Sequence, residues 1–336
     1  MVTARSLNRL RKRAGGFLIQ STLESLSQVA KLHPSAMRML RDVEVTKDVR
    51  YVSSERREHQ LDVYRPKHAS GTLPALLYLH GGAFRILSKD THWLMAGPYA
   101  RQGYAVFNAS YRLAPRFKYP AALEDAADAY AWVVDNAHRY GADASRLIIV
   151  GESAGANLSL AMTLAACFRR PEPFSQKVFA TGVAPVCTLP MCGILQVSDA
   201  ERFVRRKPRM QRLVADRLGE TQLGYLGGVI AETMAGGLEL ADPLCLIESA
   251  AEPERPLPPM FAAVGTRDPL LDDTRRLAAA LQRRGVHHEV VYYPGEIHAF
   301  YAMTWRKASR DCWRRQFEFL RANVGAQRAA AASGRV

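Results

Sequence analysis

The sequence lacks both a long hydrophobic run and a cysteine framework. No uninterrupted apolar stretch reaches the roughly 20 residues that a membrane-spanning helix needs. The apolar segment after the basic N-terminus is broken by polar residues, unlike the core of a signal peptide. The five cysteines include no CxxC pair, which argues against a disulfide framework and a zinc site. We therefore expect a soluble protein of the reducing cytoplasm, without stable membrane insertion.

The sequence also lacks the features of a nucleic-acid binder. Its 46 Lys and Arg against 32 Asp and Glu give a formal charge of +14, but the basic clusters match no recognisable nucleic-acid recognition module. Much of the excess lies near the N-terminus, within 202–217 and within 306–321, and we interpret these segments as solvated faces. With 48% hydrophobic residues over 336 positions, the chain is long enough to bury a large core.

Strand-like and helical stretches alternate along most of the chain. Short apolar runs are followed by amphipathic stretches of helix length, and this pattern predicts an α/β fold with a mostly parallel sheet and helices on both faces. The first two strand-like segments suggest an antiparallel edge. The predicted strands are 43–53, 59–66, 74–82, 104–115, 146–151, 177–186, 259–266 and 288–294, and the predicted helices are 121–140, 273–284, 310–324 and one that starts at Ala154.

One interruption of the alternation suggests a division into parts. We expect 188–240, which contains a basic amphipathic helix, to be an insertion that caps the strand ends. The helical segment 1–45 is expected to complete this cap. The α/β domain would then consist of 46–187 and 241–325, and the alanine-rich tail 326–336 is expected to be disordered.

A serine between two glycines is the first candidate for chemistry. In GESAG, Ser153 follows a buried strand and precedes a helix, and a sharp turn there would push its hydroxyl out of the sheet edge. Gly151 and Gly155 would let the chain pass at close range. A match to a five-residue motif such as this one also occurs by chance, so the prediction depends largely on the strand and the helix expected on either side of it. We predict that Ser153 is a nucleophile at a helix N-terminus, where developing negative charge is favoured.

The segment HGGAF lies at the end of an earlier predicted strand. Backbone N–H groups of a glycine-rich loop can stabilise the oxyanion of a tetrahedral intermediate. The predicted donors are Gly81, Gly82 and Ala83, together with Ala154 after the serine, and Phe84 is predicted to line the substrate pocket. The alternative is an ordinary turn between a strand and a helix.

A serine nucleophile needs a base, and His298 is the best placed histidine. It lies in PGEIHAF just after the last predicted strand, whereas His287 and His288 begin that strand at the opposite sheet edge. His80 belongs to the glycine-rich loop and is expected to brace it. The other histidines are expected to be structural or on the surface: His33, His59, His68, His92 and His138.

The carboxylate that orients the base is expected to be Asp268. It directly follows a predicted strand in GTRDPLLDD, whereas Asp272 and Asp273 are typical of the start of the next helix. The chain order Ser153, Asp268, His298 is that of the α/β-hydrolases and differs from that of the digestive serine proteases.

Five motifs in this order resemble one family. HGGAF, YRLAPRFKYPAALEDA, GESAG, GTRDPLLDD and PGEIHAF are similar to the motifs of the hormone-sensitive-lipase-like α/β-hydrolases, the bacterial family IV esterases or lipases, over roughly residues 45–321. The resemblance implies a carboxylic-ester hydrolase with a Ser-Asp-His triad, an acyl-enzyme intermediate and no metal. It also implies a cap made of N-terminal helices and an insertion before the strand of the acid.

The sequence departs from the family pattern at three positions. Ala83 stands where the family commonly has a third glycine, and its methyl group would strain the backbone if its φ is positive. Arg116 replaces a usual glutamate, and Glu152 replaces the commoner aspartate beside the serine. We expect none of these to abolish catalysis.

The expected partner is a small ester with a short to medium acyl chain, with no role for nucleic acid. A lipase, an amide or acetyl deacylase on the same scaffold, and a non-enzymatic small-molecule receptor are the alternatives. The last strand and the C-terminal helix could form the edge of a homodimer.

Overall fold

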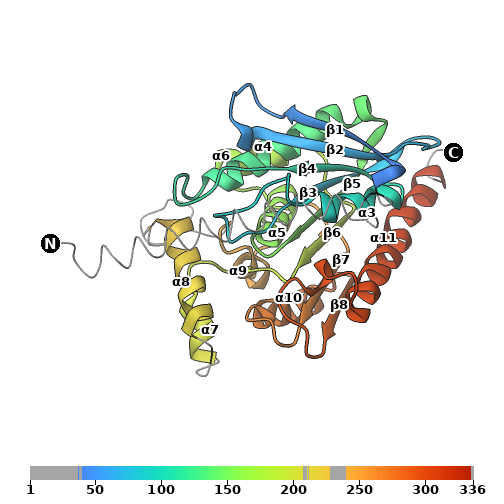
Figure 1. Ribbon diagram of the computed structural model, residues 1–336. Coiled ribbons are helices and arrows are strands. Elements are labelled where there is room, and N and C mark those ends of the chain that lie inside the picture. Colours follow the sequence, from blue (N-terminus) through green and yellow to red (C-terminus); the bar gives the residue numbers. More distant parts are fainter. Residues whose placement is uncertain (1–36, 38–39, 207–209, 211, 228–239, 334–336) are drawn as a thin grey trace.

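The computed structural model describes residues 37, 40–206, 210, 212–227 and 240–333 (Figure 1). The expected N-terminal helices therefore lie almost entirely outside the described residues. The core is one sheet of eight strands in the order β1-β2-β4-β3-β5-β6-β7-β8. The strands are β1 Val43–Arg50, β2 Gln60–Pro66, β3 Leu73–Leu79, β4 Ala105–Ala109, β5 Ala142–Glu152, β6 Cys187–Met191, β7 Met260–Gly265 and β8 His288–Tyr293.

The sheet has the predicted mixture of directions. β1 and β2 pair antiparallel with each other, and β2 pairs antiparallel with β4. All pairs from β4 through β3, β5, β6 and β7 to β8 are parallel. The carboxyl ends of β3, β5, β6, β7 and β8 therefore meet at one edge of the sheet. The expected mostly parallel sheet with an antiparallel edge is confirmed.

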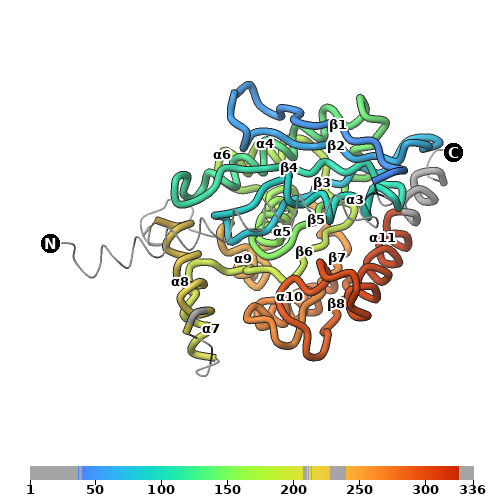
Figure 2. The backbone as a smooth tube through the Cα atoms, viewed as in Figure 1, coloured from blue at the N-terminus to red at the C-terminus, as the bar shows by residue number. Residues whose placement is uncertain are grey.

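Helices cover both faces of the sheet (Figures 1 and 2). On β3, Leu77 packs in one core cluster, whereas the neighbouring Leu76 packs in the other, as the two-residue period of a strand requires. The first cluster includes residues of α4 Ala121–Asn136, α5 Ala154–Cys167 and α10 Leu271–Arg283, and the second includes residues of α3 Trp93–Arg101 and α11 Lys307–Ser333. Helix α11 continues past the predicted 310–324 into the segment expected to be disordered.

The strand predicted at 177–186 is wrong. Its first residues belong to α6, Pro173–Ala180, and β6 begins only at Cys187. Pro173 occupies the first turn of α6, and Phe174 and Val178, four residues apart, both face the core. Gly182, with φ of 73°, follows this helix. The apolar run therefore contains the end of a helix and a turn before the strand starts.

The chain leaves the sheet after β6 and forms a pair of helices that projects from the α/β body (Figure 1). These are α7 Glu201–Arg206 and α8 Arg212–Leu226, and the short α9 Pro243–Glu248 precedes β7. The first residues of the segment expected as the cap insertion, 188–191, belong to β6. Among the described residues, no helix combines the length and the hydropathy needed to cross a bilayer.

Candidate active site

Ser153 lies on a strained turn between β5 and α5. Its φ of 56° and ψ of −113° are unusual for a residue other than glycine. The backbone holds this conformation from both sides, because Ser153 N–H donates to Met191 O at 3.0 Å and Ser153 O accepts from Ile194 N at 3.3 Å. The turn places Ser153 at the carboxyl end of β5 and at the N-terminus of α5, as the sequence predicts.

The glycines beside Ser153 have the predicted steric role. A Cβ atom on Gly155 would lie 2.0 Å from Leu79 O at the end of β3, and one on Gly151 would lie 2.3 Å from Gly155 O. Both distances are far below van der Waals contact, and both neighbours are backbone atoms that cannot turn aside. The strand, turn and helix can pass this closely only without side chains at the two positions.

The glycine-rich loop after β3 has an unusual backbone. Gly82, Ala83 and Phe84 have φ values of 113°, 56° and 59°. A Cβ on Gly82 would lie 2.1 Å from Ile86 O, so only glycine fits there. Ala83 does have the positive φ under which its methyl group strains the backbone, at a cost of about 1 kcal/mol.

Gly81 does not have the predicted role of an oxyanion donor. Its N–H donates to Glu152 Oε1 at 2.6 Å, so this amide is already engaged with a buried carboxylate. The contact ties the glycine-rich loop to the residue before Ser153. Gly82, Ala83 and Ala154 remain as the candidate oxyanion donors.

Phe84 packs inside the protein and does not line an open pocket, which corrects the predicted contact with substrate. Its side chain is 0% exposed, and its ring stacks on Tyr225 of α8 with centroids 3.9 Å apart and an interplanar angle of 9°. Arg85 extends the contact with α8 through an ion pair to Glu220 at 3.2 Å. The glycine-rich loop is therefore packed directly against α8, which projects from the α/β body.

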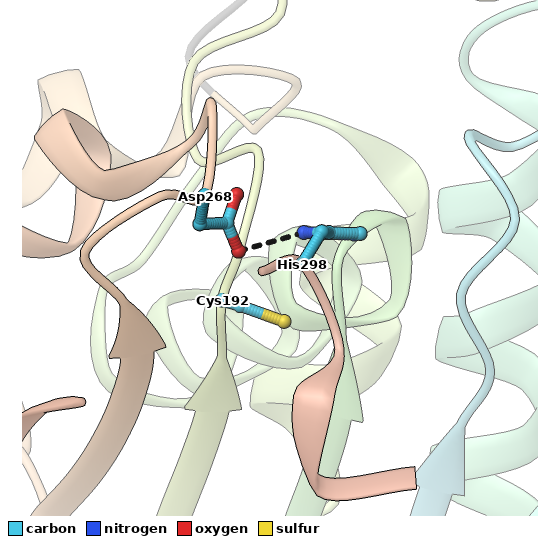
Figure 3. Close-up of side chains that lie close together, drawn as sticks. All are labelled: Cys192, Asp268 and His298. Atoms are coloured by element: carbon cyan, nitrogen blue, oxygen red, sulfur yellow. Dashed lines mark hydrogen bonds and ion pairs between the residues drawn. The ribbon is translucent and has the colours of Figure 1, made fainter. Parts of the chain in front are cut away.

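The predicted base and acid are paired. His298 Nδ1 lies 2.8 Å from Asp268 Oδ2, and Asp268 is fully buried (Figure 3). Because the carboxylate accepts this bond, Nδ1 carries the proton in the neutral imidazole, and Nε2 then has the lone pair that a general base needs. Asp268 is held in turn, since its Oδ1 accepts the N–H of Leu270 at 2.8 Å.

Asp268 also raises the pKa of the His298 imidazole. Burial of His298 opposes protonation, but the charge of Asp268, its hydrogen bond and the neighbouring Cys192 together outweigh burial and hold the pKa of His298 well above its ordinary value. An imidazolium that forms during a reaction would therefore be stabilised.

The end of β6 brings the two halves of the site together. Ser153 N–H donates to Met191 O, and the next residue, Cys192, has its Sγ within 4.8 Å of ligand atoms of both Asp268 and His298 (Figure 3). Parallel strand ends therefore place Ser153, Asp268 and His298 at one edge, as predicted.

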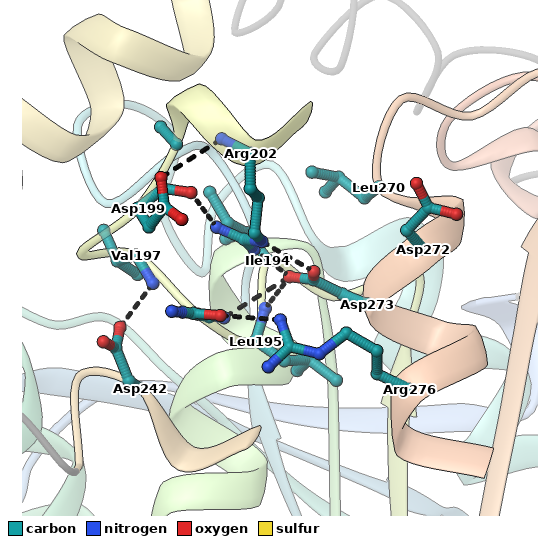
Figure 4. Close-up of polar contacts among 12 residues, drawn as sticks. Ile194, Leu195, Val197, Asp199, Arg202, Asp242, Leu270, Asp272, Asp273 and Arg276 are labelled. Carbon is teal, nitrogen blue, oxygen red and sulfur yellow. Dashed lines mark hydrogen bonds and ion pairs between the residues drawn. The ribbon is translucent and has the colours of Figure 1, made fainter. Parts of the chain in front are cut away.

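Asp273, the neighbouring candidate acid, has a structural role. It lies in the first turn of α10, as predicted, and it is completely buried. Its carboxylate accepts from Leu195 N at 2.8 Å and pairs with Arg202 of α7 at 2.5 Å (Figure 4). Asp242 binds the same segment through Val197 N at 2.5 Å. These carboxylates anchor the chain between β6 and α7 to the α/β body.

Histidines on the other side of the site also have structural roles. His80 stacks on Tyr111 with centroids 4.2 Å apart, and its Nδ1 lies 2.7 Å from Gly81 O. Burial lowers the pKa of His80 to about 3, so it is neutral at physiological pH. This agrees with the prediction that it braces the glycine-rich loop. His288 starts β8, as expected, at the opposite edge of the sheet.

Sequence reasoning missed the network around Glu152. His92 Nε2 lies 2.7 Å from Glu152 Oε1, and Tyr78 donates its hydroxyl to Glu152 Oε2. Burial disfavours the charged form of His92, but Glu152 raises the pKa of His92 above its ordinary value. The available signal was the acidic residue directly before Ser153, since a buried carboxylate there needs partners.

Comparison with known proteins agrees with this geometry. The α/β-hydrolase fold family matches residues 76–302. The ethyl acetate hydrolase of Pseudomonas putida is 34% identical over 255 residues, which cover 73% of this chain and 73% of that protein. The carboxylesterase NlhH of Mycobacterium tuberculosis is 31% identical over 243 residues, which cover 71% of this chain and 70% of that protein.

Solved structures give the same result. The monoclinic form of the Pyrobaculum calidifontis esterase has a TM-score of 0.69 and 25% identity, with 93% of each chain covered. A bacterial heroin esterase has a TM-score of 0.72 at 22% identity, with 91% of this chain and 90% of that chain covered, which supports the fold alone. The chain therefore belongs to the α/β-hydrolase fold family, in its hormone-sensitive-lipase-like branch of bacterial family IV esterases.

Proposed function

We propose that this carboxylic-ester hydrolase acts on esters of short to medium acyl chains through Ser153, His298 and Asp268, with a covalent acyl-enzyme intermediate. The main support is the His298–Asp268 pair, 2.8 Å apart, at the same sheet edge as Ser153 on its strained turn. His92 also lies beyond the end of a strand and has a carboxylate partner, but its Nε2 is engaged by Glu152 and its side chain is buried, so it is not placed to act as the base.

The mechanism follows from the roles of these groups. His298 Nε2 accepts the hydroxyl proton of Ser153 as the serine oxygen attacks the ester carbonyl. Asp268 keeps the imidazole oriented and stabilises its cation. The alcohol leaves with the proton from His298, and water then attacks the acyl-enzyme by the same steps to release the acid.

The negative oxygen of the tetrahedral intermediate needs donors that are fixed before the reaction starts. We assign this role to the backbone amides of Gly82, Ala83 and Ala154. Gly81 supports them indirectly, since its bond to Glu152 ties the loop to the turn that carries Ser153.

The preference for short to medium acyl chains rests on two observations. The ethyl acetate hydrolase to which the chain is similar acts, by its name, on an ester with a two-carbon acyl group. In addition, α8 packs directly on the glycine-rich loop through Tyr225 and Phe84, which limits the space beside the reacting carbonyl.

The test is hydrolysis of p-nitrophenyl acetate, butyrate, octanoate and palmitate, with matched amides beside them. We expect the highest kcat/KM on acetate or butyrate, and Ser153→Ala should lose roughly 10⁴-fold or more in kcat. Ser145→Ala, at an exposed position of β5, is the control and should keep full activity. Substantial activity in Ser153→Ala would refute the assignment. A preference for palmitate would indicate a lipase, and a preference for amides would indicate an amide deacylase.

We also propose a cytoplasmic location for the enzyme. All five cysteines are unpaired, as suits a reducing compartment. Cell fractionation tests this: the esterase activity should follow a cytoplasmic marker, and recovery with an extracytoplasmic marker would contradict the proposal.

A further inference from the structure

A thiol, a carboxylate and an imidazole meet beside the proposed catalytic base. Single ligand atoms of Cys192, Asp268 and His298 all lie within 4.8 Å of one another (Figure 3). The side chains come from three different connections, after β6, β7 and β8, so only the folded sheet brings them together. The hydrolysis mechanism uses the carboxylate and the imidazole but gives no role to the thiol.

These three groups are held in place by their surroundings. Cys192 is fully buried, and its N–H donates to Ala263 O at 3.1 Å on β7. Its Sγ lies 3.6 Å from the hydroxyl of Tyr301, whose own carbonyl accepts from Trp313 Nε1 at 3.0 Å. Asp268 is fixed by Leu270 N–H, so its second oxygen faces His298.

We propose that Cys192, Asp268 and His298 form an inhibitory binding site for a thiophilic divalent cation such as Zn²⁺ or Cd²⁺. Thiolate, imidazole and carboxylate are the ligand types that zinc takes, at about 2.0–2.3 Å each. Mg²⁺ and Ca²⁺ prefer sites made of oxygen atoms alone, so they should not compete. The side chain of His298 is 35% exposed, which gives the cation access from solvent.

Binding would remove the base without removing any residue. The S–H bond of Cys192 breaks, its proton goes to solvent, and a sulfur–metal bond forms. If the cation binds Nδ1 of His298, the ring proton that Nδ1 carried moves to Nε2. Nε2 then has no lone pair with which to accept the proton of Ser153. If the cation takes Nε2, it occupies that lone pair directly. Both cases stop hydrolysis, and a chelator should reverse the inhibition.

The inhibition rests on the proposed function, but the binding does not, so the two are measured separately. Co²⁺ is added to Ser153→Ala protein, which cannot turn over, and thiolate-to-cobalt charge-transfer absorption is recorded. We expect this absorption with Cys192 present and its loss in the double variants with Cys192→Ala or His298→Gln. Cys245→Ala, at a partly exposed cysteine of α9, is the matched control and should keep it. Absorption that survives Cys192→Ala would overturn the proposal, whether or not the protein hydrolyses esters.

Inhibition is then measured on active protein. Zn²⁺ should inhibit the wild type and Cys245→Ala equally, with recovery after EDTA. In Cys192→Ala, measured against its own uninhibited rate, the half-inhibitory concentration should rise roughly tenfold or more. Equal sensitivity of Cys192→Ala and the wild type would show that zinc acts elsewhere.

Discussion

The two halves of the active site are held by different means. Around Ser153 and the glycine-rich loop, backbone atoms approach so closely that a Cβ on Gly155, Gly151 or Gly82 would lie 2.0–2.3 Å from a carbonyl oxygen. Around His298 and Asp268 there is one such approach, since a Cβ on Gly265 would lie 2.1 Å from Glu296 O. The orientation of the acid and the base depends instead on hydrogen bonds of ordinary length. The nucleophile half should therefore be more sensitive to an added atom, and the acid–base pair to a changed hydrogen bond.

The largest effect is expected from adding one methyl group to the nucleophile half. In Gly155→Ala the new Cβ must displace the end of β3 or the start of α5, so we expect a loss of about 3 kcal/mol in the free energy of unfolding and of nearly all activity. Urea unfolding and ester hydrolysis measure the two effects.

Gly219→Ala in α8 is the matched control for that change. Nothing lies within 4 Å of its new Cβ, so the same methyl group should stabilise the protein slightly through helix propensity. Equal tolerance of both substitutions would show that close backbone contact does not hold Ser153.

In the acid–base half, Asp268→Asn should leave the fold intact and lower kcat by about 10⁴-fold, with little change in KM. An amide can donate its N–H to Nδ1 of His298, which places the ring proton on Nε2 and removes the base. Asp272→Asn nearby, where the carboxylate pairs with the exposed Arg275 at 3.4 Å, should stay within about twofold of the wild type. A nearly active Asp268→Asn enzyme would place the acid at another residue.

Glu152 connects the two kinds of support, since its side chain holds the backbone of the glycine-rich loop. Glu152→Gln keeps the shape but weakens the acceptor of Gly81 N–H, so we expect kcat to fall by about tenfold with KM nearly unchanged. Without the negative charge, the pKa of His92 should fall, which NMR titration of the histidines would measure. A change in KM alone, with the pKa of His92 unmoved, would mean that Glu152 only packs.

The smallest effect is expected at Ala83. Replacement by glycine removes the cost of the positive φ, so the free energy of unfolding should rise by up to about 1 kcal/mol. The higher conformational entropy of glycine in the unfolded chain reduces this gain. Chemical denaturation measures it, with Ala302→Gly in the short helical turn near His298, where φ is negative, expected to be destabilising. Destabilisation of the same size at both positions would show that Ala83 is not strained.

The sequence could predict the positions of Ser153, Asp268 and His298 because each follows a strand, and the carboxyl ends of parallel strands share one edge. The spacing of Gly151 and Gly155 around Ser153 likewise predicted that the backbone passes closely on both sides of the serine. Local pattern alone was enough for these features, since strand direction and connection length leave few alternatives.

Other features depend on partners that no local pattern reveals. The engagement of Gly81 requires knowing that Glu152 points at its amide, and the burial of Phe84 requires Tyr225 of a distant helix. Helix α3 was not predicted at all, since it contains Pro98 and its apolar residues surround much of the helix. The strand predicted at 177–186 was also wrong, because this apolar run contains the end of α6 and the turn before β6.

The central claim is that Ser153 is the nucleophile, and covalent labelling tests it most directly. Wild-type protein is treated with a fluorophosphonate, digested, and the modified peptide is sequenced by mass spectrometry. We predict phosphonylation of Ser153 alone, slowed by a competing ester, strongly reduced in His298→Gln and absent in Ser153→Ala. Modification of another residue at the same rate, or labelling that persists in Ser153→Ala, would contradict the account.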